Sequence, residues 1–449
     1  MFLTRLMRIG PLPTTSDGLH QIWWFGTCCC MSLINLACFG IDSNLLEQHD
    51  PNPIGATMPT VDPAAETASY LAALTPAQHA QAAAYTHGGE WLLLWTWLVG
   101  LLVCVLILRS GILVRLRIAV ERRRARPNIA ACVCVPGFLL LDWLLMLPWT
   151  AYANWFRERS YGLSTQPFPD WLGQSAIGTA IGIVLMIPLL LVIYALIRRT
   201  RLWWAWGGGV GAVFIVFSIV IAPVLIEPAF NHYTPAPSGA VRETVSRLAR
   251  NVGVPDARIV IYDGSRQSNR YTANVSGLFG SARVAMSDVM FAKNADLAEI
   301  RGVVGHELGH YVLHHALWLA LGFSFLFILA GWLSDRFYEP LCRQLPTAGV
   351  IGLADPAGLP VLMVIASTLG LLATPLTNSM TRIIESQADR FSLEHVNEPD
   401  GLSKALAKTI QYRAGSPSRL EEILFYDHPS VQRRIRRAME WKATHPPSS

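Results

Sequence analysis

The chain has 449 residues, enough by length alone for two or three ordinary domains. Hydrophobic residues make up 52% of it and charged residues only 15%, whereas a typical soluble chain has about 25% charged residues, so the composition argues against a purely soluble protein. The formal net charge of +5 is too small to indicate a nucleic-acid-binding protein, and we expect no nucleic-acid partner.

Seven apolar stretches are each close to the about 20 residues that a helix needs to cross a bilayer. The first follows Arg5 and Arg8, as in a signal peptide, but it is long and lacks a clear small-residue cleavage site, so we expect a retained span. The sequence therefore predicts a multi-pass α-helical membrane protein with about seven spans and the lipid bilayer as a partner. The expected spans are 21–41, 91–108, 129–153, 174–196, 203–226, 316–334 and 357–378.

Asp142 lies within the third expected span. A carboxylate at this depth is costly, so it usually faces the interior of a helix bundle or water. Two interpretations stay open: Asp142 forms part of the wall of an internal cavity, or it lies near a span end and reaches polar neighbours.

Arginine residues are concentrated in two short loops between spans. The loop 109–127 carries seven of them, and the loop 197–202 carries three, at positions 198, 199 and 201. Cytoplasmic loops are enriched in Arg and Lys, so this count places both loops in the cytoplasm. The fifth span then leaves the cytoplasm, and the polar region after Glu227 is expected outside.

The polar part of the chain predicts a small α+β region between the fifth and sixth spans and a helical tail after the seventh. The segment 42–90, rich in Pro, Ala and Thr, is expected to be exposed and weakly structured. Apolar residues at helical spacing predict a helix over 239–252, and three short runs predict strands at 257–262, 271–276 and 283–286. Further helices are expected at 295–315, continuing into the sixth span, and at 381–394, 402–412 and 429–441.

The segment from His306 to His310 reads His-Glu-Leu-Gly-His. Two histidines at positions i and i+4 of a helix share one face, so both rings can reach one Zn²⁺ ion. Glu307 lies beside them, where it can take a proton from a metal-bound water. The alternative is a helix on which two unrelated histidines and an exposed glutamate coincide.

A catalytic zinc site needs a third protein ligand and an open position for water. Glu385 and Asp389 are one helical turn apart in a second predicted helix. Glu385 would complete a His-His-Glu ligand set, and Asp389 would accept a hydrogen bond from a ligand imidazole and fix its orientation. In the alternative interpretation these carboxylates pair with Arg382 and Arg390 on a charged surface helix.

These motifs resemble those of the type I CAAX prenyl endopeptidases, membrane zinc proteases of the gluzincin kind. The resemblance is strongest over 227–316 and returns at 382–391 and 425–435. It rests on Pro228-Ala229-Phe230-Asn231 with Thr234-Pro235, Asp263-Gly264-Ser265-Arg266, Gly277-Leu278, Arg283-Val284, Ser287-Asp288, Gly305 to His310 with His315, and Glu385, Ala388 and Asp389.

The resemblance implies a ring of seven helices around a large internal chamber, one zinc ion per chain and cleavage of peptides near a lipidated C-terminus. It implies that Asp389 matters for catalysis and that His428 faces the site, where it could stabilise the tetrahedral oxyanion. Without the resemblance, His428 could simply precede a helix that begins with Pro429. The resemblance also places the catalytic region on the cytoplasmic side, which conflicts with the arginine count.

One segment departs from the family pattern. Where the family has Ser-Asn-Ala-Tyr on the strand that binds substrate, this chain has Tyr271-Thr272-Ala273-Asn274. The strand can still pair with an extended peptide through its backbone. Asn274 cannot simply take the role of the family asparagine, and Asn269 is expected in a turn.

The predicted function is therefore zinc-dependent hydrolysis of peptide bonds in a peptide or protein substrate, with a prenylated C-terminus as one candidate. Two alternatives are a membrane quality-control protease of the same chemistry and a non-catalytic scaffold or transporter with structural zinc. The corresponding division of the chain is a five-span membrane region at 1–226, a catalytic α+β region at 227–315, two further spans at 316–378, and a helical tail with the third zinc ligand at 379–449.

Overall fold

The computed structural model describes residues 61–445, apart from 269, 271, 278–281 and 292–294. Six helical stretches in this part are long and apolar enough to cross a membrane. The first span expected from the sequence, at 21–41, lies outside the described residues. The six stretches are Pro76–Ser110, Pro127–Ser160, Phe168–Arg199, Trp203–Ala229, His315–Cys342 and Pro356–Val396.

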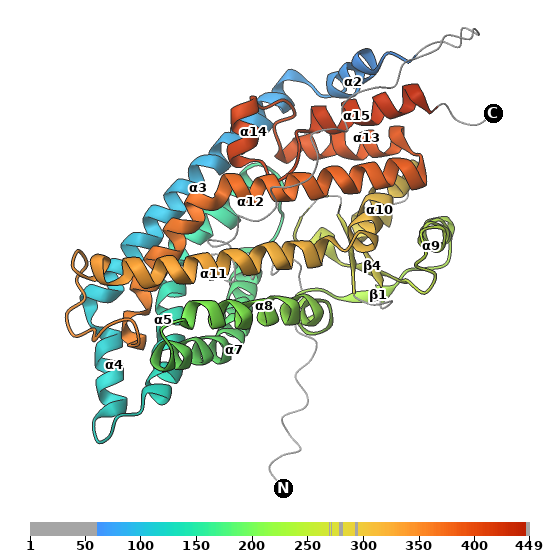
Figure 1. The fold of residues 1–449 in the computed structure, drawn as a ribbon. Coiled ribbons are helices and arrows are strands. Elements are labelled where there is room, and N and C mark those ends of the chain that lie inside the picture. The colour runs from blue at the N-terminus through green and yellow to red at the C-terminus, as the bar shows by residue number, and fades with distance from the viewer. Residues whose placement is uncertain (1–60, 269, 271, 278–281, 292–294, 446–449) are drawn as a thin grey trace.

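These stretches are built mainly from long α-helices that pack against one another (Figure 1). Many large apolar side chains on them stay exposed, such as Val213 at 72% and Leu321 at 64%. An apolar outer surface of this extent is what a lipid-facing helix bundle requires. The helices are α3 (Pro76–Ser110), α5 (Pro127–Thr150), α7 (Phe168–Arg199), α8 (Trp203–Ile221), α11 (His315–Cys342) and α12 (Leu359–Val396).

The segment 42–90, expected to be weakly structured, is largely helical where it is described. Helix α2 (Pro63–Ala72) occupies part of it, and α3 begins at Pro76, well before the apolar stretch. Thr75 and Gln78 form a capping box, and Pro76 is the first helical residue, so the start of α3 has strong local signals. The expectation was wrong because it followed composition and overlooked this cap.

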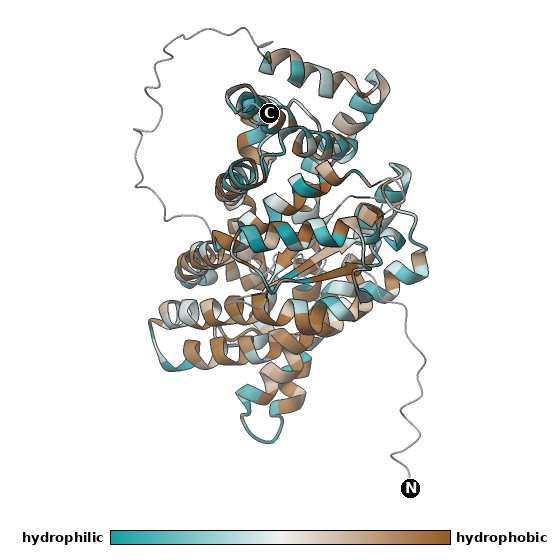
Figure 2. Cartoon of the chain, turned by 90° about the vertical axis from the view of Figure 1, so that its right-hand side faces the viewer, coloured by the Kyte–Doolittle hydropathy of each residue, from teal (hydrophilic) through white to brown (hydrophobic). Residues whose placement is uncertain are grey.

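The polar elements lie at one end of the bundle, and the arginine-rich helix α4 (Ile112–Glu121) lies at the other (Figure 1). Figure 2 shows hydrophobic residues concentrated on the long helices and hydrophilic residues frequent on the remaining elements. Helix α3 connects the two ends. The arginine-rich loop 109–127 and the polar elements therefore lie at opposite ends of the bundle.

A small sheet with the strand order β1-β2-β4-β3 forms the base of the polar region. Strands β2 and β4 run parallel, while β1 and β3 pair antiparallel at the two edges. Three of these strands were predicted, and the short edge strand β1 was missed because it contains only three residues. The strands are β1 (Tyr233–Pro235), β2 (Arg258–Tyr262), β3 (Ala273–Ser276) and β4 (Arg283–Ser287).

Helix α10 (Leu297–Val312) packs between this sheet and the C-terminal helices. Its apolar side chains, including Ile300, Val304 and Leu308, are fully buried with residues of β4 and of α9 (Ala240–Asn251). Burying a large aliphatic side chain contributes about 1.5–3 kcal/mol, so three of them hold the helix firmly. The opposite face of α10 is thereby presented to α12 and α13 (Pro399–Lys408).

The chain breaks between α10 and α11, although the sequence predicted one continuous helix through His315. His314 adopts the left-handed conformation with φ of 55°, and α11 starts at the next residue. This conformation is uncommon for a residue other than glycine. The break brings Nδ1 of His315 to 3.0 Å from Nδ1 of His310.

Helix α12, in contrast, is one element of 38 residues, where the sequence predicted a span and a separate helix. The polar residues after 376 suggested the end of the span, but no helix breaker follows them. The boundary expected at 378/379 thus falls inside a continuous helix. Helices α14 (Arg419–Phe425) and α15 (Val431–Thr444) complete the tail.

We expect Gly302→Ala to destabilise the protein by about 1–3 kcal/mol, the usual cost of overpacking. A Cβ atom at Gly302 would lie 2.6 Å from the backbone nitrogen and 2.8 Å from the Cα of Leu402, so α10 and α13 would have to separate. Alanine favours a helix over glycine, so any loss comes from this contact. Thermal unfolding in detergent measures it, with Gly173→Ala as the control because no atom lies within 4 Å there. Equal melting temperatures for both variants would contradict the packing argument.

Candidate metal centre

The site begins on α10, where His306 and His310 project from one face. Their Nε2 atoms are 3.1 Å apart. Gly305 and Gly309 lie beside them on the helix and let α12 approach closely: a Cβ at Gly305 would lie 2.7 Å from Oγ of Ser392. Helix α12 can therefore bring its own side chains to the two rings.

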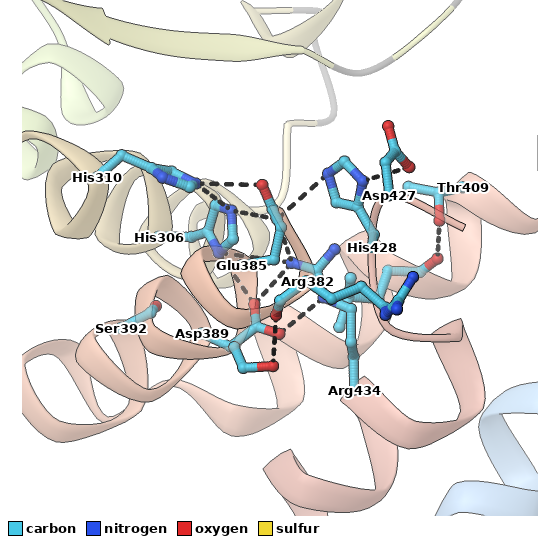
Figure 3. Close-up of polar contacts among 12 residues, drawn as sticks. His306, His310, Arg382, Glu385, Asp389, Ser392, Thr409, Asp427, His428 and Arg434 are labelled. Atoms are coloured by element: carbon cyan, nitrogen blue, oxygen red, sulfur yellow. Dashed lines mark hydrogen bonds and ion pairs between the residues drawn. The ribbon is translucent and has the colours of Figure 1, made fainter. Parts of the chain in front are cut away.

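Glu385 of α12 lies against both histidines. Its carboxylate oxygens are 3.2 Å from Nε2 of His306 and 3.5 Å from Nε2 of His310 (Figure 3). One ligand atom from each of the three residues lies within 4.8 Å of the others. The structure thus brings together the three residues that the sequence suggested as metal ligands.

The donor atoms of this group fit a metal ion. Oε2 of Glu385 is buried and accepts no hydrogen bond, and the two Nε2 atoms face each other at a distance that one proton at most can bridge. Burial lowers the pKa of His306, but the charges of Glu385 and Asp389 outweigh it and raise the pKa to about 10. The environment therefore strongly favours positive charge at this position, and two imidazoles with one carboxylate suit a metal such as zinc.

Asp389 holds the other side of the His306 ring. Its Oδ1 lies 2.9 Å from Nδ1 of His306, as expected for a donated Nδ1–H bond. A proton on Nδ1 leaves Nε2 free to bind a metal. The sequence-based role of Asp389 in orienting a ligand imidazole agrees with this contact.

Arg434 is a member of the site that the sequence analysis missed. Its guanidinium donates two hydrogen bonds to Asp389, of 2.7 Å from Nε and 2.6 Å from a terminal nitrogen, and it is 8% exposed. Figure 3 shows it reaching Asp389 from the C-terminal helix. In the sequence, Arg434 is simply a basic residue on a predicted helix. Its contact with Asp389 spans 45 positions along the chain, so local spacing does not predict it.

His428 also reaches the site. Its Nε2 lies 3.2 Å from Oε2 of Glu385, and its Nδ1 lies 2.8 Å from Oδ1 of Asp427. The ring therefore faces the metal ligands rather than serving only as a residue before a helix. The attraction of His428 and Arg413 lowers the pKa of Asp427, whose side chain is 59% exposed, so this carboxylate stays charged beside the ring.

Arg382 positions this segment instead of pairing with Glu385. Its guanidinium donates to the backbone carbonyls of Glu422 and Tyr426 and to Oγ of Ser379. Arg390 pairs with Glu394 on the surface. The alternative interpretation of a charged surface helix is therefore wrong for Glu385 and Asp389, which are both buried.

Glu307 follows the first histidine and lies in the same electrostatic environment. Burial raises the pKa of its carboxyl above the ordinary value of 4.5, while the nearby His306 and His310 act in the opposite direction. A raised pKa brings a carboxylate closer to the range in which a general base works well near neutral pH.

His315 supports the second histidine. Its ring lies between Nδ1 of His310 and Oε1 of Gln387, at 3.0 Å from each. His315 is among the residues that carry the family resemblance, and these contacts place it against His310.

Models of two protein families match most of the chain. A model of peptidase family M48 matches residues 235–442, and a model of the CAAX prenyl protease N-terminal region, described as five membrane helices, matches residues 63–232. An uncharacterized metalloprotease of Bacillus subtilis, YhfN, is 29% identical over 310 residues, which are 67% of this chain and 71% of that protein.

A CAAX prenyl protease 1 homolog of Arabidopsis thaliana is 27% identical over 314 residues, which are again 67% of this chain and 71% of the relative. The crystal structure of S. mikatae Ste24p superposes with a TM-score of 0.67 at 18% identity and covers 82% of this chain and 89% of that one. The structural match supports the fold, with a bundle of membrane helices and a small α+β metallopeptidase region. The two family models, which together span residues 63–442 almost without a gap, show that the chain belongs to peptidase family M48 and is a multi-pass membrane metallopeptidase.

Proposed function

We propose that the chain is a zinc-dependent endopeptidase whose zinc ion is held by His306, His310 and Glu385. The convergence of these three side chains, with Glu307 next to them, is the observation that carries the proposal. A zinc ion bound here would polarise the scissile carbonyl and lower the pKa of a water molecule. The non-catalytic scaffold is no longer a competing interpretation, because the family is one of peptidases.

The side chains of this protein carry out the proton transfer, the positioning of the ligands and the stabilisation of the oxyanion. Glu307 takes a proton from the attacking water and delivers it to the leaving amine. Asp389 fixes the His306 ring, and Arg434 fixes Asp389. His428 donates a hydrogen bond to the oxyanion that forms as the water attacks.

A quenched fluorescent peptide tests the metal dependence. We expect the detergent-purified protein to cleave it, a chelator to abolish cleavage, and added zinc to restore it. Cleavage that persists after chelation, with no metal left in the protein by elemental analysis, would refute the proposed zinc chemistry.

We expect His428→Gln to lower kcat by about 10²-fold, the effect of removing one oxyanion donor. Zinc content should stay unchanged, because His428 is not among the three proposed ligands. Single-turnover kinetics with the same peptide measure the change, and His395→Gln is the control because its Nδ1 contacts only a backbone carbonyl of α12. An unchanged kcat would leave His428 with a structural role alone.

A cavity of about 590 Å³ lies inside the bundle, and the three proposed zinc ligands are not among its lining residues. It is lined by residues of α3, α5 and α12, and Asp427, whose carboxylate contacts His428, lies in its wall. Asp142 is also part of this wall, in agreement with the first of its two interpretations.

We further propose that the cavity accepts the end of a peptide that carries a lipid, as the names of the CAAX prenyl protease relatives suggest. Paired peptides with and without a farnesyl-type group on the same cysteine test this. A much higher kcat/KM for the lipidated peptide supports a CAAX-type substrate, whereas equal values favour the quality-control protease.

One reporter decides on which side of the membrane the site lies. The tail that carries His428 and Arg434 belongs to the same end of the bundle as His306, while the arginine-rich helix α4 lies at the other (Figure 1). Alkaline phosphatase fused after the last residue is active only outside the cytoplasm. An active fusion agrees with the arginine count, and an inactive, expressed fusion agrees with the cytoplasmic side that the family resemblance implies.

A further inference from the structure

A second group of metal-binding side chains lies at the rim of the cavity, apart from the proposed catalytic site. His87 and Glu90 are one turn apart on α3, and Glu421 faces them from α14. Nε2 of His87 is 3.3 Å from Oε1 of Glu421, and one ligand atom from each residue lies within 4.8 Å of the others.

Among the described residues, the ion-pair partner of these two carboxylates is the His87 ring, which contacts Glu421. Oε1 of Glu90 and Oε1 of Glu421 are both buried, and neither has a hydrogen-bond partner. Among the residues that the structure describes, no arginine or lysine forms an ion pair with either of them. Two carboxylates held this close repel each other unless a cation or a shared proton lies between them.

Local structure directs the three side chains toward one another. Oε2 of Glu421 accepts the backbone N–H of Ser418 in a capping box, which leaves Oε1 for the cluster. His87 and Glu90 lie on the same face of a long helix, so both point toward α14. The His87 side chain is 57% exposed, which gives an ion access from solvent.

We propose that His87, Glu90 and Glu421 form a second, non-catalytic site for a divalent transition metal such as Zn²⁺. One imidazole and two carboxylates suit such an ion, and remaining positions would hold water. The ion would join α14 to α3 at the rim of the cavity. Helix α14 leads within three residues to His428, so the ion would also stiffen the segment that brings His428 to the catalytic site.

Zinc stoichiometry after equilibrium dialysis, measured by elemental analysis on detergent-purified protein, tests the second site. We expect two zinc ions per chain in the wild type and one in Glu90→Gln or Glu421→Gln. Glutamine at 421 can still serve in the capping box, so this variant should keep the fold of α14. Glu243→Gln, which changes an exposed carboxylate of α9, is the matched control and should keep two ions.

The His306→Ala variant separates this proposal from the catalytic one. It should keep one ion, and the double variant His306→Ala/Glu90→Gln should keep none. A stoichiometry of two in wild type that falls only with Glu90→Gln, and not with His306→Ala, would support the rim site and refute the catalytic assignment. A wild-type stoichiometry of one that is lost in His306→Ala would overturn the rim site, as would two ions retained by both glutamine variants at 90 and 421.

Hydrogen exchange of α14 gives a second readout of the rim site. Added zinc should slow exchange of the 419–425 amides several-fold in wild type and leave it unchanged in Glu90→Gln. Slowing of the same size in Glu90→Gln would show that zinc acts elsewhere and would overturn the proposed link between α3 and α14.

Discussion

The Glu307→Gln variant is expected to keep its zinc and to lose peptidase activity by about 10²–10⁴-fold in kcat. Glutamine preserves the size of the side chain and its place beside His306, but it cannot accept a proton from water. The three proposed ligands are untouched, so the metal content should equal that of the wild type. Single-turnover cleavage of the fluorescent peptide, with zinc measured on the same sample, checks both parts.

A control and a clear contrary result accompany this experiment. Glu440→Gln removes an exposed carboxylate of α15 that pairs with Arg436, and surface pairs of this kind contribute little. It should retain both zinc and activity. Full activity in Glu307→Gln would remove Glu307 from the mechanism, whereas loss of zinc together with activity would assign it to metal binding.

The Arg434→Met variant is expected to lose about 3–5 kcal/mol of stability and about 10–100-fold in zinc affinity. Arg434 is the buried partner of Asp389 and lies 3.8 Å from Glu385, so methionine would leave two buried carboxylates without their guanidinium. Asp389 would then hold His306 less firmly. Thermal unfolding and zinc competition with a chelator measure the two effects.

The location of Arg434 allows a matched control on the same helix. Arg436 lies two residues further, is exposed, and pairs with Glu440 at the surface. Arg436→Met should therefore change neither stability nor zinc affinity. Adding Asp389→Asn to Arg434→Met removes the unpaired charge and should recover part of the lost stability, while a strictly additive loss would show that the two residues act independently.

The sequence predicted those parts of the site that depend on local spacing. His306, Glu307 and His310 form a pattern within five residues of one helix, and Glu385 with Asp389 form another within one turn. Their meeting depends on the glycines at 305 and 309, which allow α10 and α12 to touch. The sequence alone does not predict how closely α10 and α12 approach each other.

The parts that sequence reasoning missed depend on tertiary structure. Arg434 is one basic residue among several on α15, and only the packed helix shows that it alone points inward, while its neighbours Arg433 and Arg436 lie at the surface. The helix break at His314 contains no glycine or proline, so the sequence does not predict it. For the fold, hydropathy located the spans well, but it could not show that α12 continues through a polar stretch, because the polar face there is buried against α10.

Because α12 is continuous, it connects the cavity to the proposed metal site. Its first half lines the cavity with Met363, Ser367, Gly370 and Thr374, and its second half carries Glu385. About 22 Å of helix, with Pro375 inside it, separates Gly370 from Glu385, at 1.5 Å per residue. A tilt imposed by a molecule in the cavity would therefore move Glu385, and by thermodynamic reciprocity a metal bound at the proposed site would alter the affinity of the cavity for that molecule. Occupancy of the cavity and the geometry of the proposed metal site would thus be linked through one helix.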